Sequence, residues 1–329
     1  MLEILILVVI LALVYDFGNG MNDAANSIST IVATKVLSPG RAVLIAALGN
    51  FVGPFLLGTA VATTIGKGIV SAAAIDSSII TTALIGAIFW TYLQTSKGFP
   101  ISVTHSLIGG LLGAGIVKVG LSGIMISKVI IVLLFIFVAP MLGLIGGILF
   151  SGLIFRLFRK SSPSRVNIYF KRLQLISSTL YSIGHGANDA QNAMGIIAIT
   201  LFTTGLLGST FYVPSWVIII CAAAISLGTL MGGWKVVRTM GMRITKLQPV
   251  DGFNAETSGG LTLFCCTLLG IPVSTTHVLA GSITGSGVIK RLSAVRWWMV
   301  KNIVWAWVLT IPASALVGIC IYLLLSVVI

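Results

Sequence analysis

The chain has 329 residues, of which 57% are hydrophobic and 8% are charged, and its formal net charge is +13. A soluble globular domain carries about 25% charged residues, so the composition excludes a soluble domain and indicates an integral, multi-pass membrane protein in a lipid bilayer. The basic residues lie in loops between apolar runs, as the positive-inside rule describes, so we expect no nucleic acid partner.

The apolar runs are continuous, which favours transmembrane helices over barrel strands, because barrel strands alternate in polarity. The first run, residues 2–34, contains a polar stretch, and we expect it to form a kinked or discontinuous helix that is retained in the protein. Further segments of this half are expected at residues 42–65, 79–92, 98–117 and 129–155.

A strongly basic stretch, residues 156–172, divides the chain. We expect it to be a cytoplasmic linker between a first repeat, residues 1–155, and a second repeat, residues 173–329. The second half follows the same order: a broken segment to residue 200, a span at 217–233, a polar pair at 253–289 and a final span.

The charge of the loops changes sides between the halves. Residues 35–41 hold two basic residues and their counterpart 201–207 holds none, whereas the loop around Lys67 has one and its counterpart 235–246 has four. The pattern predicts an all-α protein of two inverted-topology repeats with about five to six segments each, as in many secondary transporters. Both termini are then expected on the outer side.

A polar motif occurs once in each half, at residues 18–26 and 184–192, and places Asp23 and Asp189 166 positions apart. An ionisable residue inside a membrane segment is costly and usually functional. We therefore expect the two copies to face each other and to form most of a solute and ion site.

A second motif is also duplicated, at residues 98–105 and 270–277. Each copy has a proline, Pro100 or Pro272, followed by Ser and Thr, which is typical of an exposed helix N-terminus. Within a membrane protein this predicts a half-helix or a re-entrant hairpin.

The four motif copies supply carboxylates, amides and hydroxyls, and none contains Arg or Lys within its polar core. Oxygen ligands suit a hard cation, whereas helix N-termini suit an oxyanion such as phosphate. A site that holds both would let the cation offset the repulsion between the anion and the carboxylates.

These paired motifs resemble the inorganic phosphate transporter (PiT) family, over essentially the whole chain. The resemblance implies a secondary transporter that imports inorganic phosphate by symport with Na⁺, through alternating access at a midplane site in the cell (inner) membrane, without a cofactor. Carried over by position, the phosphate residues would be Asn22, Asn188, Ser102, Thr104, Ser274, Thr275 and Thr276. The Na⁺ residues would be Asp23, Asn26, Asp189, Asn192 and Glu256, with His105, His277 and Gln191 as further candidates.

Asn50 departs from the family pattern, which has a Glu there in animal relatives, so the identity of the cation stays open. Neutral oxygens around one Asp per half favour Na⁺, while the histidines keep H⁺ as an alternative. Sulfate is the alternative anion, an ion channel the alternative class of transport protein, and a homo-oligomer stays open. An intramembrane hydrolase is disfavoured, because neither Asp has a nucleophile–base partner at local spacing.

Overall fold

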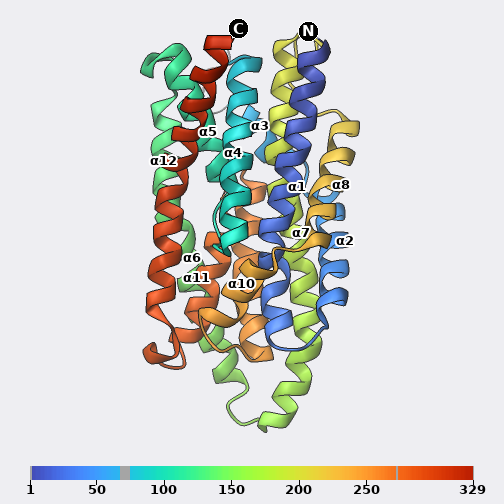
Figure 1. The fold of residues 1–329 in the computed structure, drawn as a ribbon. Coiled ribbons are helices and arrows are strands. Elements are labelled where there is room, and N and C mark those ends of the chain that lie inside the picture. Colours follow the sequence, from blue (N-terminus) through green and yellow to red (C-terminus); the bar gives the residue numbers. More distant parts are fainter. Residues whose placement is uncertain (1, 67–74, 272, 329) are drawn as a thin grey trace.

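In a computed structural model of the chain, the described residues are 2–66, 75–271 and 273–328, so Lys67 and Pro272 lie outside them. These residues form an α-helical bundle (Figure 1). The first half contains α1 (Leu2–Ala33), α2 (Pro39–Leu57), α3 (Ala60–Gly66), α4 (Ser77–Lys97), α5 (Val103–Val119) and α6 (Ile126–Leu157). The second half contains α7 (Pro163–Thr203), α8 (Ser215–Met231), α9 (Trp234–Arg238), α10 (Pro249–Leu268), α11 (Thr275–Val288) and α12 (Trp297–Val328).

Both termini lie at one end of the bundle, and the α6–α7 connection lies at the other (Figure 1). Helix α1 runs away from the end with the termini, and α7, its counterpart in the second half, runs toward that end. This antiparallel arrangement of corresponding helices is consistent with the expected inverted repeat. Helix α7 begins at Pro163, so much of the basic stretch 156–172 is helical.

The outer surface of the bundle suits a bilayer. Among the described residues, five helices (α1, α2, α4, α6 and α12) are long and apolar enough to cross a membrane, and α8 with the bent segment after it would make a sixth. Large apolar side chains on α6 and α12, such as Leu149 and Leu316, are exposed. Their exposure is favourable only against lipid hydrocarbon, so the chain is a multi-pass membrane protein.

The expected break in the first segment is absent, because α1 is one helix of 32 residues that continues through the polar motif. Helix α7 likewise continues through the second copy. The motif glycines allow close helix contact rather than a break: a Cβ on Gly20 would lie 2.0 Å from the Ile225 carbonyl of α8. A Cβ on Gly186 of α7 would lie 2.3 Å from the Asn50 carbonyl of α2.

The expected half-helices are present as the second arms of two hairpins, α4–α5 and α10–α11. Ser102 is the N-cap of α5 and accepts a hydrogen bond from the His105 amide at 3.2 Å, while Ser274 caps α11 through the His277 amide at 3.3 Å. The two hairpin tips meet inside the bundle, where the rings of His105 and His277 have centroids 5.0 Å apart.

Each hairpin is closed by an ion pair at the end opposite its tip. Lys118, near the end of α5, pairs with Asp76 at the start of α4, and Lys290, after α11, pairs with Asp251 in the first turn of α10. Across the bundle, α5 packs against α12 and α11 against α6. The two halves are therefore interlocked, and their contact surrounds the hairpin tips.

Candidate functional site

Three ionisable side chains meet where α1 approaches α7. Nε2 of His185 lies 3.2 Å from Oδ2 of Asp189 and 3.8 Å from Oδ2 of Asp23. All three side chains are buried. The two motif copies therefore face each other, and each contributes one carboxylate to the centre of the bundle.

The first turn of α11 supplies two hydroxyls to these carboxylates. Oγ1 of Thr275 lies 3.0 Å from Oδ2 of Asp189 and 3.3 Å from Oδ2 of Asp23. Oγ1 of Thr276 donates to Oδ1 of Asp23 at 3.2 Å. The hydroxyls expected to bind the anion thus contact the residues expected to bind the cation.

The last asparagine of each motif, Asn26 or Asn192, contacts the hairpin of the opposite half. On α1, the Asn26 amide donates to Oγ1 of Thr275 at 3.1 Å and of Thr276 at 2.9 Å. On α7, the Asn192 amide donates to Oγ1 of Thr104 on α5 at 2.8 Å. These crossed contacts connect the two halves at the site.

The asparagine directly before the aspartate of each motif, Asn22 or Asn188, contacts the first hairpin arm of its own half. Asn22 donates to Oγ1 of Thr95 on α4 at 2.7 Å. Asn188 pairs with Oγ1 of Thr267 on α10 at 2.9 Å. When its amide oxygen accepts from Thr267, its nitrogen donates to Oδ1 of Asp189 at 3.1 Å. Asn188 therefore reaches the carboxylate directly.

His185 is oriented by groups that sequence reasoning missed. Its Nδ1 lies 3.0 Å from Oδ1 of Asn50 on α2, and the Asn50 amide donates to Oγ1 of Thr229 on α8 at 2.8 Å. This chain of contacts directs Nε2 toward the two carboxylates. Its members lie far apart in the sequence, so no local spacing signalled it.

The remaining expected residues lie around this centre. His277 stacks against Trp307, with ring centroids 4.0 Å apart, and Trp307 in turn donates to the Pro100 carbonyl at 2.9 Å. Gln191 contacts α3: its amide oxygen accepts from the Ala62 amide at 2.9 Å. Ser102 and Ser274 use their oxygens as helix caps.

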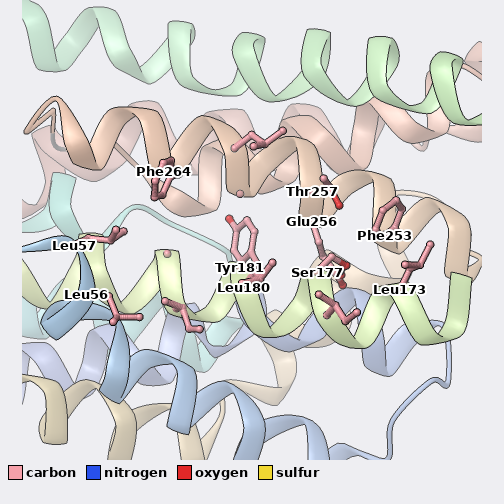
Figure 2. A pocket seen from close by; sticks show the side chains of 15 residues that line it. Leu56, Leu57, Leu173, Ser177, Leu180, Tyr181, Phe253, Glu256, Thr257 and Phe264 are labelled. Carbon is pink, nitrogen blue, oxygen red and sulfur yellow. Dashed lines mark hydrogen bonds between the residues drawn. The ribbon is translucent and has the colours of Figure 1, made fainter.

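Glu256 forms a separate buried cluster on the side of the α6–α7 connection. Its carboxylate accepts from Thr30 at 2.5 Å, from the Gln174 amide at 3.1 Å, and from the Ser177 hydroxyl. Figure 2 shows Glu256 on α10 pointing toward Ser177 on α7. Both residues line a largely apolar cavity of about 440 Å³, whose walls include Leu56 of α2 and Tyr181 of α7. Glu256 is therefore not part of the central cluster.

The central arrangement suits small ions. One atom each from Asp23, His185 and Asp189 lies within 4.8 Å of the other two, as ligands of a shared cation do. Their carboxylates and the adjacent hydroxyls are ligands for hard cations, and the N-termini of α5 and α11 present free backbone amides suited to an oxyanion.

The chain is similar to known transport proteins. The sequence pattern of the phosphate transporter family matches residues 19–318. A probable low-affinity inorganic phosphate transporter of Rhizobium meliloti is 49% identical over 319 residues, covering 97% of this chain and 96% of the relative. One of Bacillus subtilis is 38% identical over 330 residues, covering 100% and 99%.

A solved structure of a sodium-dependent phosphate transporter superposes with a TM-score of 0.88 at 30% identity, covering 99% of this chain and 100% of that one. These relatives are transporters, not enzymes. The resemblance carried by the two duplicated motifs is thereby confirmed, and the chain belongs to the phosphate transporter family.

Proposed function

We propose that the chain imports inorganic phosphate by symport with Na⁺, through alternating access at the centre of the bundle. The observation that carries the proposal is the pair of buried carboxylates, Asp23 and Asp189, placed one on each half and joined by the hydroxyl of Thr275. Two carboxylates this close repel each other unless positive charge lies between them. A bound Na⁺ would supply that charge.

In this proposal the division of roles follows the contacts. Asp23 and Asp189 bind Na⁺, and Asn26 and Asn192 support them by fixing the hairpin hydroxyls. Phosphate binds between the N-termini of α5 and α11, where backbone amides favour an anion. Its hydroxyl and amide contacts would come from Ser102, Thr104, Ser274, Thr275, Thr276, Asn22 and Asn188, with His105 and His277 beside them.

Glu256 would bind a second Na⁺ rather than share the first. It lies two helical turns along α1 from the central pair, because its partner Thr30 follows Asp23 by seven residues, about 10 Å of helix. Its cluster of hydroxyl and amide oxygens suits Na⁺.

Alternating access is supported by burial. Asp23 and Asp189 are each only 2% exposed, so ions can reach them only after a rearrangement. The α4–α5 and α10–α11 hairpins are the elements whose displacement would open the site from either side. We place the termini outside and the basic stretch 156–172 in the cytoplasm, in line with the positive-inside rule, with the halves 1–155 and 173–329 as the repeating units.

Proton coupling is a second candidate, and the position of His185 favours it. His185 is an ionisable side chain that contacts both carboxylates, so it can carry a proton in place of a bound cation. Na⁺ and H⁺ coupling therefore differ in whether His185 acts as a positive charge or as a neutral ligand.

The test is uptake of radiolabelled phosphate into proteoliposomes under an inward Na⁺ gradient, and separately under a pH gradient with choline as the only external cation. We expect uptake with Na⁺, and competition by unlabelled phosphate but not by sulfate. Uptake that ignores external Na⁺ and follows the pH gradient would replace Na⁺ by H⁺. No uptake under either gradient would refute the symporter.

Two substitutions locate the cation site. Asp23→Asn and Asp189→Asn should each abolish uptake, because each removes one of the two charges that hold Na⁺. Glu3, exposed at the start of α1, provides the control: Glu3→Gln should leave uptake unchanged. Wild-type rates in either aspartate variant would contradict the assignment.

A further inference from the structure

Asp16 is a fully buried carboxylate in the middle of α1 that the central cluster does not include. Neither of its oxygens has a hydrogen-bond partner, and no ion pair reaches it among the described residues. The amide of Asn19 is near enough to act on Asp16, but without the geometry of a hydrogen bond. A buried, unpaired carboxylate inside a membrane protein is costly, so Asp16 needs either a cation or a proton.

The position of Asp16 relates it to the transport site. It precedes Asp23 by seven residues on one face of α1, about 10 Å along the helix, on the side of the chain termini. It is close enough to Asp189 and His185 for their charges to act on it.

Asn19 lies between Asp16 and the centre. Its amide donates to the Asp189 carbonyl at 3.5 Å, while its own amide oxygen has no partner and is buried. Asp16 and Asn19 are three residues apart on α1, and both oxygens of Asp16 and the amide oxygen of Asn19 are buried without a hydrogen-bond partner.

The second half has no counterpart to Asp16. The corresponding position on α7, 166 residues later, is Ser182, whose hydroxyl donates to the Ser178 carbonyl at 2.8 Å and is thereby satisfied. The additional carboxylate thus lies on one side of the centre, opposite the side on which Glu256 lies. Such an asymmetry fits a carrier that binds ions from one side of the membrane and releases them on the other.

We infer that Asp16, with the amide oxygen of Asn19, forms an additional cation site that holds a monovalent cation between the end with the termini and the Asp23–Asp189 pair. The inference rests on the proposed cation-coupled transport. It adds a position that the cation occupies before it reaches Asp23 and Asp189. The ligands are one carboxylate and one amide oxygen, which together suit Na⁺ more than a divalent ion.

The deciding variant is Asp16→Asn, because asparagine has the shape of a protonated aspartic acid and carries no charge. If Asp16 binds Na⁺, the Na⁺ concentration for half-maximal phosphate uptake should rise about tenfold or more, since loss of a group that only supports a metal ligand already costs about that much in affinity. The maximal rate at saturating Na⁺ should persist, because Asp23 and Asp189 remain. Ser182→Ala is the matched control at the equivalent position on α7 and should leave the Na⁺ dependence unchanged.

Binding to the purified protein separates this inference from the proposed function. Without phosphate, NaCl should raise the unfolding temperature of the wild type above that in choline chloride, and Asp16→Asn should require about tenfold more Na⁺ for the same shift. Asn19→Leu removes the amide oxygen and keeps the approximate shape, and it should also raise the Na⁺ concentration needed for the same rise in unfolding temperature. Equal Na⁺ titrations of wild type and Asp16→Asn would show that Asp16 is simply protonated and would overturn the inference, even if uptake is Na⁺-coupled.

Discussion

The hydroxyl of Thr275 donates to the carboxylate of Asp189 at 3.0 Å, so the tip of the α10–α11 hairpin is joined to the polar motif of α7. The same hydroxyl lies 3.3 Å from Asp23 of α1. In the α4–α5 hairpin the corresponding position is Val103, which has no hydroxyl. The two hairpins therefore contribute unequally to the central site.

Thr275→Val should impair transport more than any other substitution in this turn of α11. Valine keeps the branched shape but leaves two buried carboxylates without this donor, and an unsatisfied buried group costs roughly 1–3 kcal/mol. We expect initial uptake rates at subsaturating Na⁺ to fall about tenfold or more. Thr275→Ser should retain most activity, and an unchanged rate in Thr275→Val would show that the hydroxyl is dispensable.

Gly186→Ala should destabilise the protein through helix contact rather than chemistry. The added methyl would lie 2.3 Å from the Asn50 carbonyl, so α7 and α2 would have to separate, at a cost of about 1–3 kcal/mol. Gly184 is the control, because a methyl there meets nothing within 4 Å. Thermal unfolding in detergent should place Gly184→Ala near wild type and Gly186→Ala well below it. Equal stabilities would contradict the packing.

Glu256→Gln should damage the cluster of which Glu256 is the acceptor. Thr30, Gln174 and Ser177 all donate to the carboxylate, so an amide NH₂ in its place would face donors instead of accepting from them. We expect loss of most uptake and a smaller Na⁺-induced rise in unfolding temperature. Thr257→Ala, beside it on the same cavity wall, should change neither. Full Na⁺ stabilisation in Glu256→Gln would exclude a cation at this position.

The ion pair between Lys118 and Asp76 should make a small, pH-dependent contribution to stability. Burial raises the pKa of Asp76, but hydrogen bonds from Lys118, the Ile79 amide and Ser78 outweigh it and hold the pKa below its ordinary value of 3.8. A carboxylate with a lowered pKa stabilises the fold above its unfolded-state pKa and loses that contribution as the pH falls through the folded-state value.

Asp76→Asn should therefore be less stable than wild type at pH 7, by roughly 0.2–1 kcal/mol because the pair is partly solvated. The difference should shrink below about pH 4, where the wild-type carboxylate becomes protonated. Unfolding temperatures measured at both pH values provide the check. A difference that stays constant with pH would mean that the carboxylate charge plays no part.

The hairpin tips could be predicted from sequence because their signals are local. Pro followed by Ser and Thr within five residues is typical of a capped helix start, and Ser102 and Ser274 cap α5 and α11 as that pattern predicts. The facing of Asp23 and Asp189 was also predictable, since a duplicated motif in a two-fold arrangement brings its copies together.

The continuity of α1 was not predictable in the same way. Polar and glycine residues at 18–26 read as a helix break when each is considered alone. In the fold, side chains such as Asn22 and Asn26 are satisfied by the hairpins, and Gly20 serves a close contact with α8, so nothing forces the helix to open. Contacts with other helices therefore offset the local cost of polar and glycine residues within α1.

The surroundings of His185 were missed for a related reason. Asn50 lies 135 positions away from it, and the contact depends on how closely α2 packs against α7. Asn50 could be recognised only as a departure from a family pattern, not as a partner. The sequence likewise grouped Glu256 with the central aspartates, whereas the structure gives it a cluster of its own.

Asn26 and Asn192 each contact the opposite half, so neither half can form this site alone. Asn26 binds hydroxyls carried by the second half, and Asn192 binds a hydroxyl carried by the first. A polypeptide with a single repeat would hold an asparagine without its threonine and a threonine without its asparagine. It could complete these contacts only by pairing with a second copy of itself.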